Sequence, residues 1–265
     1  MSQATRSSAP PSLWTIIVMM SLILYVPLIW LAWGSFHELQ SDGKWVFTLR
    51  WYGELWGDQL VWQSLSNSFY VAFISSCIST FLGAIVGLSM TQESIWQKKF
   101  IQVSTSISLA LPEIVFSISL LLFFFILNIP LSLNTVILAH ALFSFAFVAM
   151  TVTARCCLFD QAQVEAARDL GANDTQIILK IILPFLSPAL FTGWVLSFLI
   201  SFDDFLLAFF LNGIGSDTWP VKLYSAMRAG LSPKLNALTS CMMLISMVIL
   251  LSFFYLRFRK GKEAT

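Results

Sequence analysis

Three carboxylates stand inside long apolar stretches of this chain, where an ionised side chain is costly. Glu113, Asp203 and Asp204 have no Lys or Arg at comparable depth in their stretches. A charge at the centre of a membrane span costs at least about 2.5–3.5 kcal/mol on insertion scales. These acids must therefore face water, share protons or meet a cation. An elongated, multiply protonated amine suits carboxylates that have aromatic faces nearby.

Asp203 and Asp204 cannot both point straight into one pore, because neighbouring residues on a helix differ in direction by about 100°. Ser197, Ser201, Asp204 and Ala208 follow the spacing i, i+4, i+7 and i+11 and form one small, polar stripe. Asp204 is therefore the better pore candidate. The same stripe also suits a helix-packing face, since small residues mark close helix contacts.

The patterns that carry catalytic, metal or phosphate chemistry are missing. The two histidines, His37 and His140, belong to no H-E-x-x-H motif, and no G-x-x-x-x-G-K sequence exists to bind ATP. The four cysteines form no C-x-x-C pair. We therefore expect no catalytic residue, no metal site and no cofactor in this chain. His140 is expected to be a hydrogen-bonded packing residue.

The composition indicates a protein whose solvent is lipid. Of 265 residues, 57% are apolar and 11% are charged, with a mean hydropathy of +0.80. Soluble domains carry about 25% charged residues. The net charge of +1 lacks the basic excess of a nucleic-acid binder. A water-soluble enzyme, a disordered linker and a disulfide scaffold are excluded.

Six stretches have the length of about 20 mostly apolar residues that a spanning helix needs. Helix is the expected state, because lipid offers no partner to an unpaired backbone group. The third and fourth spans are joined by a short turn and should form an antiparallel hairpin. We predict an all-α membrane protein with one domain, 1–265, and spans at roughly 13–35, 64–90, 101–128, 133–155, 185–211 and 236–257.

Lysine and arginine predict the orientation. With both ends inside, the outer segments hold only Lys44, Arg50, Lys222, Arg228 and Lys234. The other ten basic residues are then inside, which favours cytoplasmic N- and C-termini. In this orientation Glu113 lies roughly 18 Å into a span entered from the cytoplasm, near the midplane.

A polar loop, 156–184, separates the fourth and fifth spans. Asp160 is placed to cap a first short helix, and Gly171 is a natural residue for positive φ at the end of that helix. Asn173 is placed to cap a second helix, with Gln176 three residues later as its reciprocal partner. The loop is therefore predicted to be two short helices with a sharp bend at Gly171.

The spacing within this loop resembles the EAA loop of ABC-importer permeases at every defined position. In that family the loop forms coupling helices, which dock into the ATP-binding subunits. The alternative is a surface loop that merely connects two spans. By resemblance, the coupling residues are Glu165, Ala166, Ala167, Asp169, Gly171, Ile181, Leu183 and Pro184.

The resemblance extends along nearly the whole chain and is strongest to the C-type permease subunit of spermidine and putrescine importers. Glu113 departs from the family pattern, which has aspartate there. The matching stretches include Arg50-Trp51-Tyr52, residues 111–115, 193–198, 219–225 and 232–238, and Asp203-Asp204. The candidate substrate path comprises Glu113, Asp204, Asp203, Trp219 and Tyr224.

The resemblance implies an assembly in a bacterial cytoplasmic (inner) membrane. Its other members are a homologous second permease, two ATP-binding subunits that bind ATP and Mg, and an extracytoplasmic polyamine-binding protein. Two alternatives remain: an ABC permease for another solute, and a self-sufficient carrier or channel. The intramembrane acids argue against an anion, and an EAA loop has no purpose in a self-sufficient carrier. The choice between spermidine and putrescine stays open.

Overall fold

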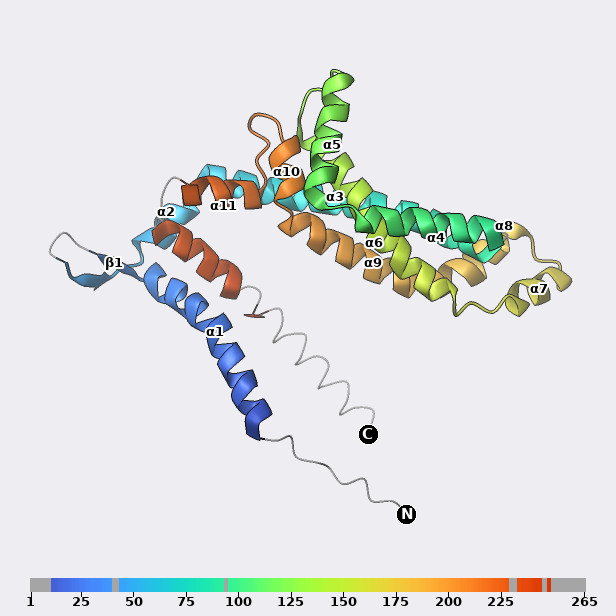
Figure 1. The fold of residues 1–265 in the computed structure, drawn as a ribbon, viewed down its shortest axis with the longest axis horizontal. Helices are drawn as coiled ribbons and strands as arrows, with labels where there is room; N and C mark the ends of the chain where they lie inside the picture. Colours follow the sequence, from blue (N-terminus) through green and yellow to red (C-terminus); the bar gives the residue numbers. More distant parts are fainter. Residues whose placement is uncertain (1–10, 40–42, 93–94, 229–232, 245–246, 249–265) are drawn as a thin grey trace, which may run out of the picture. The chain divides into compact units, whose positions relative to one another are not determined.

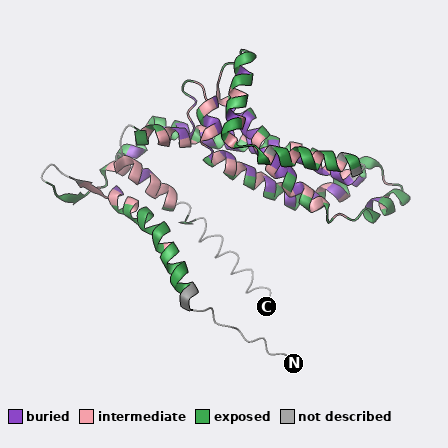
Figure 2. Cartoon of the chain, viewed as in Figure 1, coloured by how far each residue is buried: buried purple, intermediate pink, exposed green. Residues whose placement is uncertain are grey.

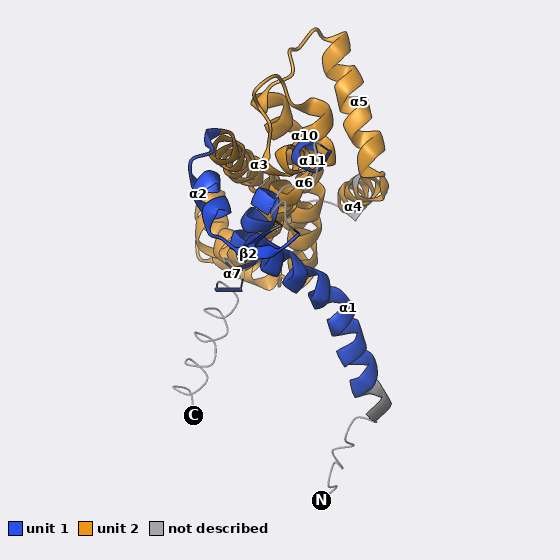
Figure 3. Cartoon of the chain, turned by 90° about the vertical axis from the view of Figure 1, so that its left-hand side faces the viewer, with its two compact units in different colours: residues 1–59, 225–265 blue, residues 60–224 orange. Residues whose placement is uncertain are grey.

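The computed structural model describes residues 11–39, 43–92, 95–228, 233–244 and 247–248. These residues are mostly helical and include one two-stranded hairpin (Figure 1). The chain divides into two compact units (Figure 3). Unit 1 comprises residues 1–59 and 225–265, and unit 2 comprises residues 60–224.

Unit 1 combines a long apolar helix with a small antiparallel hairpin, in which His37 pairs with Phe47 and Leu39 with Trp45. Its first helix is exposed along most of its length (Figure 2), as expected for a helix that is apolar all round and faces lipid. Residues 233–244 are also helical. The labelled elements are α1 (Pro11–Ser35), β1 (His37–Leu39), β2 (Trp45–Phe47) and α2 (Arg50–Trp56).

Unit 2 is a bundle of helices. The first residue of α3 and the last four of α11 fall in unit 1. The elements are α3 (Gln59–Gln92), α4 (Ile95–Ala110), α5 (Glu113–Ile126), α6 (Leu133–Cys156), α7 (Ala162–Asp169), α8 (Asp174–Ile177), η1 (Ile178–Ile182), α9 (Leu183–Asp203), α10 (Leu206–Leu211) and α11 (Trp219–Arg228).

Four helical stretches in the described part of the chain are long and apolar enough to cross a membrane. Three of them, α1, α3 and α6, match predicted spans to within five residues at each end. The sixth predicted span, 236–257, lies partly outside the described residues. Its described parts, 236–244 and 247–248, are helical.

Helices α3, α6 and α9 pack closely because glycines remove side chains at their crossings. A Cβ added to Gly83 of α3 would lie 2.4 Å from Val148 Cγ1, and one added to Gly193 of α9 would lie 2.9 Å from the same atom. Gly87 would similarly meet Val152 Cγ1 at 2.5 Å. Small residues allow such close approach between membrane helices, where packing and not water exclusion holds them together.

The third predicted span, 101–128, is not one continuous helix. Helix α4 ends at Ala110 and α5 begins at Glu113, with Pro112 extended between them (φ −59°, ψ 132°). Proline has no N–H to donate, and it disfavours helical backbone in the residue before it. Figure 1 shows that α4 lies beside α6, whereas α5 diverges and packs against α10. The predicted third-and-fourth-span hairpin is therefore interrupted.

The helix observed at the fifth predicted span, 185–211, begins and ends at other residues than predicted. Helical structure runs without a gap from Asp174 through η1 to Asp203, so the second loop helix does not end at Pro184 as predicted. In the π-helical η1, the N–H of Leu183 donates to the Ile178 carbonyl, five residues back. This wider turn precedes Pro184, whose ring would crowd an ordinary α-helical carbonyl. The helix then breaks at Asp204.

Candidate functional site

The two helix breaks of unit 2 bring two predicted site residues together. Glu113 is the first residue of α5, and Asp204 lies between α9 and α10. Because α5 packs against α10, the Glu113 carboxyl comes within side-chain hydrogen-bonding reach of the Asp204 carboxyl. We call these two residues the acidic pair. Discontinuous helices whose ends meet are a common way to build a transporter site.

Local backbone geometry fixes each member of the acidic pair. Asp204 is extended (φ −68°, ψ 125°), and its Oδ1 accepts the N–H of Leu207 at 2.9 Å. It therefore caps α10 while only 9% exposed. Glu113 is half-buried, and its carbonyl accepts a hydrogen bond from Ser117 Oγ at 2.8 Å. Asp204 is thus held in the bundle, whereas Glu113 stands nearer the surface.

Asp203 differs from its neighbour, because it is exposed and belongs to the last turn of α9. The serines of the predicted stripe are packed between helices: Ser197 is fully buried and Ser201 is 4% exposed. Ser201 Oγ lies 2.6 Å from His140 Nδ1 and accepts a hydrogen bond from Ser75 Oγ at 3.0 Å. The serine part of the stripe is therefore a packing face, and His140 is the hydrogen-bonded packing residue that was predicted.

The charge of the acidic pair has no basic partner in its helices. Residues 101–154 and 181–221 contain neither Lys nor Arg. Two adjacent carboxylates repel each other unless a proton or a cation lies between them. Among the described residues, no group of three His, Cys, Asp or Glu could hold a metal ion. The arrangement thus requires a proton shared by the two carboxyl groups or a cation beside them.

The two aromatic candidates lie in different surroundings. The Tyr224 ring lies 4.8 Å from the ring of Phe205, the residue after Asp204. Trp219 is 6% exposed, and its backbone N–H donates to Ser68 Oγ of α3 at 2.7 Å. The structure thus places Tyr224 close to the helix break, whereas Trp219 anchors α11 to the bundle.

The loop between α6 and α9 has the bend that its sequence predicts. Gly171 adopts φ +83°, its N–H donates to the Arg168 carbonyl, and the Ala172 N–H donates to the Ala167 carbonyl, each at 2.9 Å. This pair of bonds is a Schellman motif, which requires a left-handed residue at the bend. The predicted cap is also present: the Gln176 N–H donates to Asn173 Oδ1 at 2.8 Å.

Helix α7 has one anchored face and one exposed face. Val164 is 8% exposed and packs with Val152, Ile177, Ile182 and other residues of a hydrophobic cluster. On the side of the bend, Leu170 is 89% exposed, and it is not one of the predicted coupling residues. Its signal was an apolar side chain in a polar loop. Among the predicted coupling residues, Glu165, Ala166, Asp169, Gly171 and Pro184 are exposed, and Ala167, Ile181 and Leu183 are half-buried.

Similar proteins agree with this architecture. The family described as "Binding-protein-dependent transport system inner membrane component" matches residues 79–261. The spermidine/putrescine transport system permease protein PotC of Escherichia coli (strain K12) is 34% identical over 230 residues, covering 86% of this chain and 87% of that protein. The putrescine transport system permease protein PotI of the same strain is 30% identical over 261 residues, covering 94% and 92%.

Solved structures of more distant proteins share the fold. A chain of a bacterial ABC transporter involved in alginate import superposes with a TM-score of 0.70 at 18% identity, covering 97% of this chain and 99% of that one. A chain of the MetNI methionine ABC transporter gives 0.57 at 19% identity, covering 80% and 97%. In such importers the partner ATPase hydrolyses ATP, so this multi-pass membrane chain is a transport subunit and not an enzyme. It belongs to the binding-protein-dependent transport system inner membrane component family, as a permease subunit of an ABC importer.

Proposed function

We propose that this chain forms half of the translocation path of an ATP-driven importer for polyamines such as spermidine or putrescine. The observation that carries the proposal is the acidic pair, two carboxylates from separate helix breaks with no basic residue in their helices. The names of the relatives PotC and PotI support the same substrate class. A polyamine supplies the positive charge that the acidic pair lacks.

The exposures of the candidate path residues suggest an order of contact. Glu113 is half-buried and Asp204 is buried, so an ammonium group meets Glu113 first. Tyr224 and Phe205 add aromatic faces, which attract cations through the ring quadrupole. Asp203 is exposed at the end of α9 and takes a secondary part. Trp219 supports the path by holding α11 in place.

The exposed side of α7 is the proposed docking surface for an ATP-binding subunit. Glu165 and Asp169 offer carboxylates there, and Ala166 permits close approach. The full assembly contains a homologous second permease, two ATP-binding subunits and an extracytoplasmic binding protein. Closure of the ATP-binding subunits moves α7 and α8, and the membrane helices open in alternation to either side.

We further propose that residues 1–265 form one membrane domain with six spans and with both termini in the cytoplasm. The third span is the broken pair α4 and α5, and the sixth includes helical residues 236–244. The basic residues divide ten to five between inner and outer segments in this orientation, which fits the positive-inside rule.

Uptake by the reconstituted complex tests the proposed function. Vesicles containing both permeases, the ATP-binding subunits and the binding protein should accumulate labelled spermidine or putrescine only when ATP is supplied. Labelled alginate oligosaccharide and methionine serve as control solutes. Uptake of either control without uptake of any amine would reject the polyamine assignment and leave the family assignment intact.

Cysteine labelling tests the orientation. Ile214 and Leu170 are both strongly exposed, at 109% and 89%. In a background without native cysteines, Ile214→Cys should react with a membrane-impermeant maleimide added outside cells. Leu170→Cys should react only after the membrane is permeabilised. The opposite pattern would reverse the proposed topology.

A further inference from the structure

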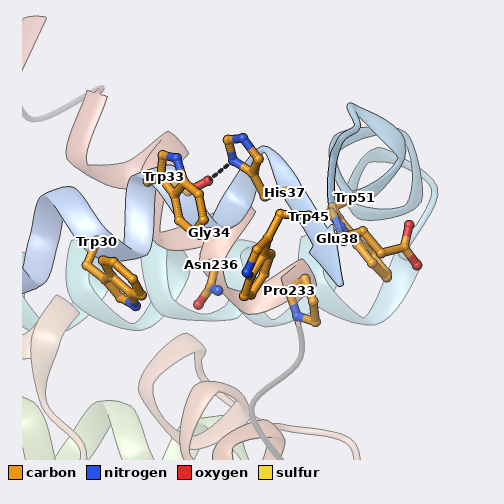
Figure 4. A pocket seen from close by; sticks show the side chains of 9 residues that line it. All are labelled: Trp30, Trp33, Gly34, His37, Glu38, Trp45, Trp51, Pro233 and Asn236. Atoms are coloured by element: carbon orange, nitrogen blue, oxygen red, sulfur yellow. Dashed lines mark hydrogen bonds between the residues drawn. The ribbon is translucent and has the colours of Figure 1, made fainter. Parts of the chain in front are cut away.

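Unit 1 contains a pocket that the proposed translocation path does not use. The pocket has a volume of 310 Å³ and lies where the end of α1 meets the β hairpin and helical residues 233–244 (Figure 4). Four tryptophans line it: Trp30 and Trp33 from α1, Trp45 from β2 and Trp51 from α2. Small-ligand sites commonly have about this volume and an aromatic lining with a few polar groups.

The tryptophan rings enclose the pocket at an angle to one another. The ring centroid of Trp33 lies 5.2 Å from that of Trp30 and 5.2 Å from that of Trp45, with interplanar angles of 33° and 59°. His37 stacks on Trp33 at 4.2 Å, and its Nδ1 lies 2.8 Å from the Trp33 carbonyl oxygen. Trp45 is 53% exposed, and Trp33, which has His37 on one face, is 38% exposed, so both rings keep surface that a ligand can reach.

Polar groups distinguish this pocket from a simple belt of tryptophans at a membrane surface. The Asn236 amide lies against α1, because a Cβ on Gly34 would approach Asn236 Nδ2 to 3.1 Å. Trp51 Nε1 is buried and has no hydrogen-bond partner among the described residues. Glu38 lies at the rim of the pocket. The pocket therefore combines aromatic faces with a hydrogen-bond acceptor, a donor and a negative charge.

The charged residues around the pocket leave Glu38 weakly paired. Arg50 donates to Glu54 Oε1 at 2.7 Å, but its guanidinium is 3.9 Å from Glu38 Oε1. Lys234, beside the pocket residue Pro233, pairs with Asp58. Glu38, Glu54 and Asp58 are thus matched in number by Lys44, Arg50 and Lys234, and Glu38 has a longer contact to Arg50 than Glu54 has.

We propose that this pocket binds a primary alkyl-ammonium group, the terminal amine of a polyamine, between the faces of Trp33 and Trp45 with Glu38 as its counter-ion. Tryptophan is the aromatic side chain that attracts cations most strongly. The identity of the amine and its approach from outside rest on the proposed function and orientation. The pocket would hold a polyamine released by the binding protein before transport.

A phosphatidylethanolamine headgroup carries the same primary ammonium, so the test must separate the two sources. The full importer complex is labelled with 5-fluorotryptophan and purified in maltoside detergent, which contains no amine. The ¹⁹F resonances of Trp33, Trp45 and Trp56 are assigned by single Trp→Phe replacements. Trp56 is the control, because it is 75% exposed in the same unit but does not line the pocket.

Titrated spermidine should shift the Trp33 and Trp45 resonances and leave that of Trp56 unchanged. Glu38→Gln should weaken the apparent affinity about tenfold, the lower end for losing a contact to a charged group at a partly exposed site. Glu38→Asp keeps the charge and should retain most of the affinity. n-Butylammonium should produce the same shifts, which tests the pocket even if the complex transports another solute.

Three results would overturn the proposal. One is the absence of amine-dependent shifts, or shifts that Glu38→Gln leaves unchanged. A second is the same shifts on adding phosphatidylethanolamine, but not phosphatidylglycerol, with no displacement by spermidine; the headgroup would then be the ligand. The third is a response to the binding protein alone, which would make the pocket a protein docking site.

Discussion

The loop between α6 and α9 and the acidic pair are built in opposite ways. The loop is shaped by hydrogen bonds between residues close in sequence, such as that from the Ala162 N–H to Asp160 Oδ1 at 3.0 Å and the cap at Asn173. The acidic pair joins Glu113 and Asp204, which meet only because two broken helices pack together. Local capping therefore determines the proposed coupling surface, whereas tertiary packing determines the proposed substrate site.

This contrast is sharpest at Asp203 and Asp204. The two residues are chemically identical and adjacent, yet Asp203 is exposed, whereas Asp204 is buried with only 9% of its surface exposed. The cause is that Asp204 leaves the helix to cap α10. The capping hydrogen bond holds the Asp204 carboxyl at the helix break. In that position Asp204 can meet Glu113 of α5.

Replacing Gly171 with valine should have the largest effect, and it should act on the loop alone. A Cβ at Gly171 would meet nothing within 4 Å, so the penalty is conformational and not steric crowding by neighbours. The left-handed backbone at φ +83° costs a non-glycine residue about 1–2 kcal/mol, and a β-branched one more. We expect a folded bundle that no longer retains its ATP-binding subunits in pull-down experiments.

Gly171→Asn is the matched control, because asparagine tolerates the left-handed region. It should retain the ATP-binding subunits and transport. Gly171→Val with normal subunit retention and normal uptake would disprove the assignment of this bend to docking.

Neutralising the acidic pair should reduce uptake without affecting assembly. Glu113→Gln and Asp204→Asn remove the charge but keep size and hydrogen bonding, and an amide oxygen at Asp204 can still cap α10. Losing a desolvated contact to an ammonium costs about 1.5–3 kcal/mol. That corresponds to a roughly ten- to hundredfold decrease in uptake per assembled complex.

Asp203→Asn is the natural control for this pair of variants, because Asp203 is exposed and does not cap α10. Its uptake should remain close to that of the unmodified complex. Poor expression of Asp204→Asn with normal uptake per complex would instead assign Asp204 a purely structural part. Normal uptake by both Glu113→Gln and Asp204→Asn would remove the acidic pair from the substrate path.

The sequence predicts elements that depend on local hydrogen bonds or on the length of an apolar stretch. Helices α1, α3 and α6 follow from apolar length, and the caps and bend of the loop follow from Asp160, Gly171 and Asn173. Pro112 stands inside the apolar length of the third predicted span, yet the helix is interrupted there, between Ala110 and Glu113. Periodicity alone extended α9 beyond Asp203, because a polar residue inside an apolar run gives no signal of a cap.

Features that depend on distant segments could not be predicted. The contact between Glu113 and Asp204 requires α5 to leave α6 and pack on α10, and nothing in either helix specifies this partner. The pocket around Trp33 and Trp45 requires a hairpin of two three-residue strands, which are too short for a pattern of alternation.

The smallest predicted effect on transport tests whether packing holds the acidic pair while leaving the loop unaffected. Gly83→Ala places a methyl group where Val148 Cγ1 is 2.4 Å away, so either the Val148 side chain or the spacing of α3 and α6 must change. Overpacking of this kind costs about 1–3 kcal/mol and should lower the thermal inactivation midpoint of the purified complex. Uptake should fall because α9, which ends just before Asp204, packs on the same Val148 through Gly193, while the ATP-binding subunits remain bound.

A second substitution tests whether the loss of stability in Gly83→Ala comes from the contact with Val148 or from a general destabilisation of α3. Val148→Ala removes the clashing Cγ1, so the double variant should be more stable than the two single effects added together predict. Gly53→Ala in α2, where a Cβ meets nothing within 4 Å, should be neutral or stabilising by about 0.5–1 kcal/mol. Purely additive effects at Gly83 and Val148 would show that the close crossing does not limit stability. Loss of the ATP-binding subunits in Gly83→Ala would show that the loop depends on bundle packing as much as the acidic pair does. The distinction between a locally formed loop and an acidic pair held by tertiary packing would then be wrong.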